Sequence, residues 1–260
     1  MPNVLILAAL ATIGLALSQA DITEPRPSEN IIAENDIDLV TDIASAYEQA
    51  SQILQGVIEA ATARPDAVAD ENIVGPTLGS VYCSGSLVYG SHSERVSDLS
   101  PVGSACLSKG KAAMAAAWRP AHEQAVLATR DILDVAILRP STIYGPYITA
   151  RTGIVHVNDV AAGFHAAIDR IDGRLGGWPG FDLVAETIGI QGIIEGVKAA
   201  LGVAAEVENT GTHGGAFLEA MNLVSKNDAA RTRTVPEWEP KRKNFVLNLP
   251  VYVRAWEAAQ

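Results

Sequence analysis

The sequence predicts an α/β fold with a mostly parallel sheet and flanking helices, and three observations carry this prediction. Short apolar segments, typical of buried strands, alternate with segments of helical spacing along the 260 residues. Residues 135–140 are almost continuously apolar, as expected for a strand that is covered on both faces. The composition is 48% hydrophobic and 19% charged, which indicates a folded chain with a large core.

In the first half of the chain the elements follow from hydrophobic periodicity and from turn residues. An apolar run enters a turn of small residues and leaves it with helical spacing, which is the layout of the first strand and helix of a dinucleotide-binding sheet. The predicted elements are, in order, this unit over residues 4–18, a helix over 30–35 after a polar segment, a strand over 38–44, a helix around 53–61 that Pro65 ends, a strand over 79–85 running into 86–90, a helix over 112–133 and a strand over 135–140.

The second half continues the alternation of strands and helices. Asn158 is predicted to cap one helix through its side chain, and Gly202 is predicted to end another. The elements are, in order, a strand over 154–157, a helix over 159–170, a strand over 181–185, a helix over 190–201, a short strand over 203–208, a helix around 217–224 and a closing segment over 245–260.

Charge and cysteine content exclude several classes of function. The formal net charge is −11, with a pI near 4.9. This argues against nucleic acid as a partner, because phosphate binding needs a basic face. Two cysteines, Cys83 and Cys106, are too few for a disulfide framework, and no ligand cluster surrounds them in the sequence. We therefore expect no metal site.

Residues 1–20 also fit a secretory signal peptide, because residues 18–20 (SQA) form a small-x-small cleavage pattern. Against this alternative, no Lys or Arg precedes the apolar run, and residues 12–14 supply the turn that a strand and helix need. We expect a buried strand and helix here, in a cytoplasmic protein without a membrane segment. Secretion after removal of residues 1–20 is the alternative.

Five stretches of the chain carry a resemblance to a known family. They are, in order, the opening turn at 8–14, VYCSGSLVYG at 81–90, LRPSTIYGP at 138–146, VHVNDVA at 155–161 and VPEWEP at 235–240. Each stretch alone is weakly specific, but in this order they resemble the extended short-chain dehydrogenases, the NAD-dependent epimerase/dehydratase family. The resemblance implies a Rossmann-like NAD(P)-binding domain over residues 1–185 and a small C-terminal, substrate-side lobe over 186–260.

The resemblance also implies where NAD or NADP binds. The family's G-x-x-G-x-x-G turn reads Ala8, Ala11 and Gly14 here. An alanine methyl group pushes the phosphates away from the backbone, so the site is weakened, whereas Gly14 keeps the packing of helix on strand. Thr142 and Ile143 match positions near the nicotinamide amide. The implied cofactor-binding residues are Ala8, Ala11, Thr12, Ile13, Gly14, Ala44, Pro140, Thr142 and Ile143.

The family's catalytic Ser, Tyr and Lys are not preserved. The serine position falls on Gly85, between Ser84 and Ser86, while Ala115 stands at the tyrosine position and Arg119 at the lysine position. An arginine can bind a ribose or phosphate oxygen, but a guanidinium that stays protonated is a poor proton relay. The catalytic candidates are Ser84, Ser86 and Arg119.

The chain also lacks segments that are usual in the family it resembles. Two strands are missing between the first helix and the strand at 38–44, which would leave the first strand at a sheet edge. A reduced variant and a sequence that omits pieces of a longer protein both fit this observation.

Two functions follow from the resemblance and its gaps. The first is an NAD(P)-binding oxidoreductase or epimerase that acts on a hydroxyl or carbonyl group of a small metabolite. The second, which rests on the lost positions, is a non-catalytic, NmrA-like binding or sensor protein on the same fold. A small-molecule substrate is the expected partner in the first case, and a homodimer stays open in both.

Overall fold

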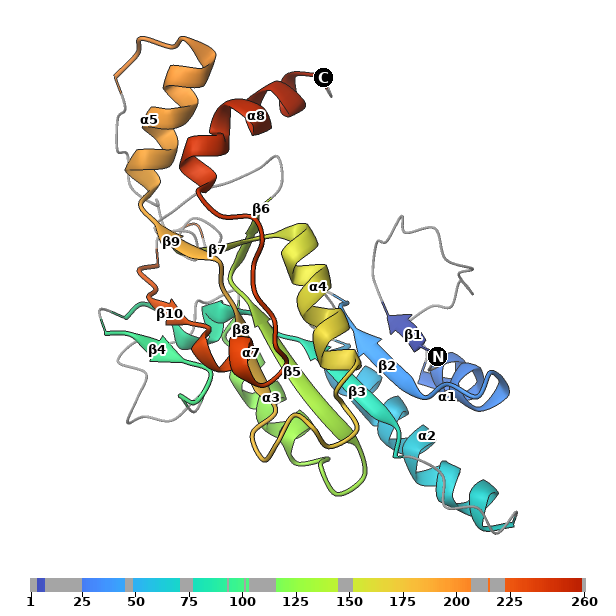
Figure 1. Cartoon of the computed structure of the whole chain (residues 1–260). Coiled ribbons are helices and arrows are strands. Elements are labelled where there is room, and N and C mark those ends of the chain that lie inside the picture. The colour runs from blue at the N-terminus through green and yellow to red at the C-terminus, as the bar shows by residue number, and fades with distance from the viewer. Residues whose placement is uncertain are drawn as a thin grey trace. The chain divides into compact units, whose positions relative to one another are not determined.

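The computed structural model of the chain describes residues 4–7, 25–44, 49–70, 77–92, 94–100, 102, 116–144, 152–206, 215 and 223–258 (Figure 1). The chain divides into two compact units. Unit 1 consists of Met1–Cys83, Ala121–Ile137 and Ala167–Pro179, and unit 2 consists of Ser84–Pro120, Leu138–Ala166 and Gly180–Gln260. The predicted division at residue 185 separates a cofactor domain from a substrate lobe, and it stays a prediction.

Three parallel strands form the described sheet of unit 1 up to Cys83. They are β1 (Val4–Leu7), β2 (Leu39–Asp42) and β3 (Gly79–Cys83). The next strand, β5 (Asp134–Pro140), begins in unit 1, where the Asp134 amide donates to the Leu78 carbonyl at 3.1 Å. The strand order of the whole sheet is β1-β2-β3-β5-β8. The prediction of an α/β fold with a mostly parallel sheet is confirmed.

The position of β1 in the sheet agrees with the prediction that the chain lacks two strands of the family's usual sheet. β1 is the first strand in the sheet order and pairs with β2. Within the described residues, no strand lies on the other side of β1. The resemblance predicts this arrangement, because the loss of two strands between the first helix and residues 38–44 would leave the first strand at a sheet edge.

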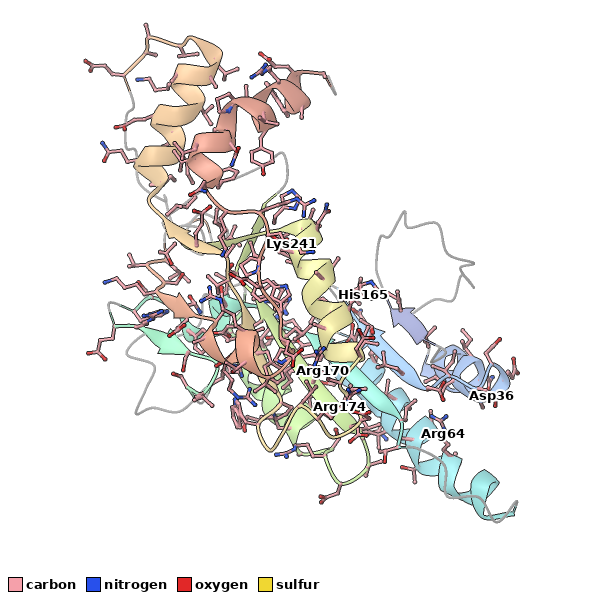
Figure 2. The ribbon with its side chains drawn as sticks, in the orientation of Figure 1. Asp36, Arg64, His165, Arg170, Arg174 and Lys241 are labelled. Carbon is pink, nitrogen blue, oxygen red and sulfur yellow. The ribbon has the colours of Figure 1, made fainter. Side chains whose placement is uncertain are left out.

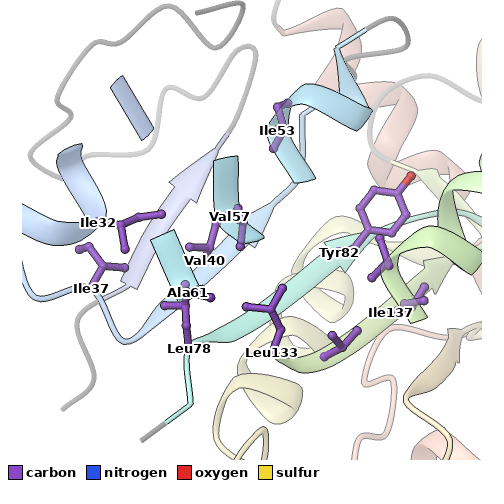
Figure 3. Close-up of a cluster of buried hydrophobic side chains, with 12 residues drawn as sticks. Ile32, Ile37, Val40, Ile53, Val57, Ala61, Leu78, Tyr82, Leu133 and Ile137 are labelled. Atoms are coloured by element: carbon purple, nitrogen blue, oxygen red, sulfur yellow. The ribbon is translucent and has the colours of Figure 1, made fainter. Parts of the chain in front are cut away.

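The core of unit 1 is a cluster of apolar side chains between the strands and helix α2 (Figure 3). Helix α2 (Ala50–Asp70) buries Ile53, Val57 and Ala61, which are spaced four residues apart and therefore share one face. They pack with strand residues such as Val40. The apolar periodicity that predicts this helix is thus the pattern that buries it.

The predicted boundaries of both helices in this region are wrong at segments that contain proline. Helix α2 does not end at Pro65 but continues to Asp70, and α1 (Pro25–Glu34) begins five residues before the predicted start at 30. A proline at a helix start removes an amide that has no intrahelical partner anyway, so Pro25 fits there. Burial of the apolar face of α2 outweighs the hydrogen bond that is lost at Pro65.

Arg64, labelled in Figure 2, ties α2 to the strand that follows α1. Its guanidinium donates to the Ile37 carbonyl at 2.9 Å and to the Asp38 carboxylate at 3.2 Å. Both acceptors directly precede β2. The contact fixes α2 next to the start of β2 at the residue directly before Pro65.

Unit 2 contains the end of β5 together with β8 (Gly180–Leu183) and two small sheets. In one, β6 (Thr142–Tyr144) pairs in parallel with β7 (Thr152–His156), which pairs antiparallel with β9 (Glu186–Ile188). In the other, two-residue strands pair in parallel, namely β4 (Val96–Ser97) and β10 (Asn227–Asp228).

The helices of unit 2 are η1 (Ser86–Tyr89, a 3₁₀ helix), α4 (Val157–Ile168), α5 (Ile190–Leu201), α7 (Ala230–Thr234) and α8 (Phe245–Glu257), while α3 (Arg119–Leu127) begins at its border. Helices α5 and α8 share a core with Ile154. Gly202 ends α5 as predicted, and its φ of 66° is the left-handed conformation that favours glycine. Residues 203–206 form no strand, contrary to the prediction, and residues 217–222 lie outside the described residues.

The Glu186 carboxylate caps α8 from a distant element. It accepts the amide of Asn244 at 3.2 Å and the amide of Phe245 at 2.7 Å. Asn244 has a φ of 60°, so the chain turns sharply into the helix at this residue. A negative charge at a helix N-terminus is favourable and also satisfies amides that have no intrahelical partner.

Two glycines of α5 provide a matched test of its packing. Among the described residues, a Cβ at Gly192 would meet no atom within 4 Å, whereas a Cβ at Gly196 would lie 2.6 Å from Cδ1 of Leu249, which is buried in the α5–α8 core. We expect Gly192→Ala to raise the free energy of unfolding by about 0.5–1 kcal/mol through helix propensity. Gly196→Ala should lower it by about 1 kcal/mol through overpacking. Urea denaturation followed by circular dichroism measures both, and a gain in both variants would contradict the packing described.

Within the part of the chain that the structure describes, no helix is both long enough and apolar enough to cross a membrane.

Candidate functional site

In unit 1, the candidate cofactor-binding region is the edge where the strands end. The register pairs Leu7 with Asp42, so β1 and β2 finish side by side. The Asp42 carboxylate accepts the amide of Ala44 at 2.9 Å, which fixes the chain as it leaves β2. Ligands of open α/β sheets bind at this carboxyl edge. The predicted residues Ala8, Ala11, Thr12, Ile13 and Gly14 follow β1 and lie outside the described residues.

In unit 2, the candidate residues include Ser84 and Ser86. The Ser84 amide donates to the Leu138 carbonyl at 2.8 Å, so the segment after β3 runs beside β5. Both serine side chains are buried, and Ser86 is the first residue of η1. Among the described residues, the nearest atom to a Cβ at Gly85, between them, would be the Pro140 carbonyl oxygen at 3.8 Å. A Cβ at the position where the resemblance expects a serine would therefore make an ordinary contact with this part of the structure.

Pro140, Thr142 and Ile143 follow directly at the end of β5. The Ser141 amide donates to the Leu183 carbonyl at 3.0 Å, and the chain then enters β6, which pairs with β7. Pro140 is buried, Thr142 is half-buried and Ile143 is 46% exposed. Unit 2 thus brings the serine segment beside Pro140, with Thr142 and Ile143 two and three residues further along the chain.

Arg119 begins α3 and is half-buried. Its guanidinium carbon lies 5.0 Å from the centroid of the Trp118 ring, a cation–π distance. This contact holds the guanidinium near the ring of its neighbour. A role of Arg119 at the proposed site stays a prediction.

The structure adds a group of buried polar residues that the sequence analysis did not select. Arg139 is fully buried in β5, and its Nη1 donates to the Tyr89 hydroxyl at 2.8 Å. The Tyr89 hydroxyl in turn donates to Oδ1 of Asp182 at 2.9 Å, and Asp182 is fully buried as well. The one signal in the sequence is an arginine inside an otherwise apolar strand, because a charge is rarely buried without a partner.

A second half of this polar group is centred on Asp98 and Thr232. The Thr232 hydroxyl lies 2.7 Å from the Asp182 carbonyl oxygen and 3.0 Å from Oδ2 of Asp98. Burial raises the pKa of Asp98, while the Thr232 hydrogen bond and the positive charge of Arg231 oppose this rise. Arg231 donates to the Gly180 carbonyl at 2.9 Å and stacks over Phe181 at 4.4 Å. The group thus connects β5, β8 and α7.

Two of the motifs that carry the resemblance contact each other in unit 2. Asp159, in the first turn of α4, is buried, and its carboxylate accepts the Arg242 amide at 2.9 Å. The Arg242 guanidinium lies 3.5 Å from the other carboxylate oxygen. Nε1 of Trp238 donates to the Asp159 carbonyl at 2.7 Å. The segment 238–242 is therefore anchored on the start of α4.

His156 rather than Asn158 supports the start of α4. The helix begins at Val157, so Asn158 lies inside it, and the Asn158 amide donates to Nδ1 of His156 at 3.1 Å. The histidine ring is also 6.3 Å from the Tyr252 ring of α8. Burial and the positive charge of Arg242 lower the pKa of His156, while Asp159 raises it by less. An acceptor at Nδ1 requires that this nitrogen carry no proton.

This contact predicts a pH dependence of stability. Because the fold favours neutral His156, the unfolded chain takes up a proton first as the pH falls below the usual pKa of 6.5, and the free energy of unfolding decreases. His156→Asn keeps an acceptor for the Asn158 amide but cannot titrate. We expect its stability to fall less than that of the parent protein between about pH 7 and pH 5. Equal pH profiles in urea denaturation would contradict this interpretation.

In the described ranges, no group of three or more His, Cys, Asp or Glu side chains is placed to hold a metal ion.

Comparison with known proteins identifies solved structures of similar fold. No protein-family model matches the chain, and no curated protein matches its sequence. Among solved structures, a dTDP-glucose 4,6-dehydratase from Bacillus anthracis in complex with NAD is 16% identical with a TM-score of 0.62, over 93% of this chain and 79% of its own. A UDP-glucose 4-epimerase from Thermotoga maritima with UDP-glucose is 13% identical with a TM-score of 0.65, over 98% of this chain and 91% of its own.

A third neighbour, RMD from Pseudomonas aeruginosa complexed with NADPH, is 14% identical with a TM-score of 0.64 and covers 100% of both chains. These neighbours do not favour the NmrA-like alternative. The chain therefore has the fold of the NAD-dependent epimerases and dehydratases, as the order of its five motifs predicts.

Proposed function

We propose that this protein binds NAD or NADP and acts as an oxidoreductase or epimerase on a hydroxyl or carbonyl group of a small metabolite. The observation that most directly supports this proposal is the strand register of unit 1. In this register β1 and β2 end together, at the edge where this fold binds ligands. Neighbours of the same fold are complexed with NAD or NADPH. In unit 2, the serine segment lies beside Pro140, since a Cβ at Gly85 would be 3.8 Å from the Pro140 carbonyl oxygen, so two segments of the proposed site are neighbours.

Each group at the proposed site would contribute a different part of the binding or the chemistry. The bound nicotinamide would supply or accept a hydride. Thr142 and Ile143 would contact its amide, and the hydroxyls of Ser84 and Ser86 would hydrogen-bond the substrate oxygen. Arg119 would hold an anionic oxygen without exchanging its proton, because a guanidinium stays charged. The sequence places Ala115 where the family has its tyrosine, so the usual proton donor is missing and slow turnover is expected.

Titration of the purified protein with NADH and NADPH, followed by nicotinamide fluorescence, tests the proposal. Binding of at least one cofactor is expected, and no binding at millimolar concentration would contradict it. Replacing both Ala8 and Ala11 by Gly should tighten binding about tenfold, because the pyrophosphate can then approach the backbone. Ala9→Gly is the matched control, since it adds a glycine outside the fingerprint and should leave the affinity unchanged.

Turnover is then tested with a panel of carbonyl and hydroxyl compounds that includes UDP-glucose and L-threonine. The first compound is bound by one structural neighbour, and the second is the substrate named for another, an L-threonine 3-dehydrogenase with a TM-score of 0.67. Cofactor-dependent conversion of any compound supports the enzymatic part of the proposal. Binding of cofactor without turnover of the panel would limit the function to binding.

A further inference from the structure

The buried residues Arg139, Tyr89 and Asp182 form a continuous hydrogen-bonded bridge inside unit 2. The guanidinium donates to the phenol oxygen at 2.8 Å, and the phenol donates to the carboxylate at 2.9 Å. The Arg139 guanidinium also lies 5.4 Å from the centroid of the Tyr89 ring. Hydrogen bonds between a charged and a neutral group are stronger than those between two neutral groups, and burial strengthens them further.

Each member of this bridge stands close in sequence to a segment of the candidate site. Tyr89 is the last residue of η1, which begins at Ser86. Arg139 directly precedes Pro140 at the end of β5. Asp182 directly precedes Leu183, whose carbonyl accepts both the amide of Ser141 and its hydroxyl, at 3.0 and 3.2 Å. The bridge therefore joins the serine segment to the segment of residues 140–143.

We infer that Tyr89, Arg139 and Asp182 are positioning residues, which fix the serine segment 84–86 relative to the nicotinamide segment 140–143. This inference rests on the proposed cofactor site. The phenol oxygen is the atom of Tyr89 that joins the two charged groups, because it accepts from Arg139 and donates to Asp182. Without the bridge, η1 keeps its own turn but loses its tie to Arg139 and Asp182.

The test compares Tyr89→Phe with Thr232→Val. Tyr89→Phe removes the bridging oxygen and keeps the ring. Thr232→Val removes a fully buried hydroxyl from the other half of the same polar group, where it contacts Asp98 and the Asp182 carbonyl. Both variants should lower the melting temperature. Only Tyr89→Phe should disturb the two segments of the candidate site.

The first readout is affinity for NADH compared with ADP-ribose, which lacks the nicotinamide. We expect Tyr89→Phe to weaken NADH binding about tenfold and to leave ADP-ribose binding unchanged, because the misplaced segments contact only the nicotinamide end. Thr232→Val should leave both affinities unchanged. Equal weakening of NADH and ADP-ribose in Tyr89→Phe, or unchanged binding of both, would overturn the inference.

The second readout needs no cofactor and separates the two proposals. Amide hydrogen exchange should rise in Tyr89→Phe in peptides that contain residues 84–90 and 140–144, and it should stay at the parent level there in Thr232→Val. If the parent protein binds neither ligand, the proposed function fails, and this exchange pattern alone decides the positioning role. If amide hydrogen exchange in both peptides of Tyr89→Phe stays at the level of the parent protein, the positioning role of Tyr89 is overturned.

Discussion

Replacing Arg139 by methionine is expected to lower the free energy of unfolding by about 3–5 kcal/mol. The guanidinium is fully buried, donates to the Tyr89 hydroxyl and supplies positive charge next to the buried carboxylates of Asp182 and Asp98. Methionine has a similar volume, so the loss reports charge rather than a cavity. Urea denaturation followed by circular dichroism measures the difference, and a loss below about 1 kcal/mol would contradict the described network.

A second substitution separates charge from packing in this prediction. Arg139→Met combined with Asp182→Asn removes one positive and one negative charge, and it should recover part of the stability that the single variant loses. If the double variant is less stable than the sum of the two single variants predicts, then the carboxylate of Asp182 does not depend on Arg139.

Replacing Asp159 by alanine is expected to lower the free energy of unfolding by about 2–3 kcal/mol. The carboxylate is buried at the start of α4, where a negative charge is favoured, and it accepts the amide of Arg242. Its removal releases segment 238–242, in which Trp238 is also buried. Thermal unfolding followed by tryptophan fluorescence detects both the lost stability and the exposure of Trp238.

Arg242→Ala is the matched control for Asp159. The Arg242 side chain is 43% exposed, so its ion pair with Asp159 is screened by water, whereas its backbone amide keeps the hydrogen bond in the variant. The expected loss is therefore at most about 1 kcal/mol. Equal losses of unfolding free energy in the two variants would mean that the ion pair, rather than the buried amide contact, anchors segment 238–242.

Much of the fold follows from local patterns in the sequence. The apolar run of β5 predicts a strand buried on both faces, and the spacing of Ile53, Val57 and Ala61 predicts the buried face of α2. Gly202 predicts the end of α5 through its left-handed backbone. Pro65 shows the limit of such rules, because a local preference yields when an apolar helix face is buried against a sheet.

The candidate site was less accessible from the sequence. The sequence predicts that Ser84 and Pro140 belong to the ends of two strands, at 79–85 and 135–140, but only the structure shows that their segments lie side by side. The bridge from Tyr89 to Asp182 spans 93 residues, and no local pattern pairs residues at that separation. The arginine in β5 signals that a buried partner exists, but only the fold identifies it.

The contact between the motifs at 155–161 and 235–240 explains why both carry the resemblance. Trp238 donates to the Asp159 carbonyl, and the chain after it returns to the Asp159 carboxylate. The two motifs therefore describe one packing unit. Their recognition supports the fold more strongly than it supports catalysis, since neither residue belongs to the predicted cofactor or catalytic set.

The described surroundings of Gly85 also bear on what a serine would do at this position. The backbone there is extended, with a φ of −177°, a conformation that any residue adopts, and an added Cβ would make only an ordinary contact with Pro140. Replacing Gly85 by serine is therefore expected to leave the backbone of segment 84–86 unchanged, so that the effect of an added hydroxyl can be measured separately from a change in the fold.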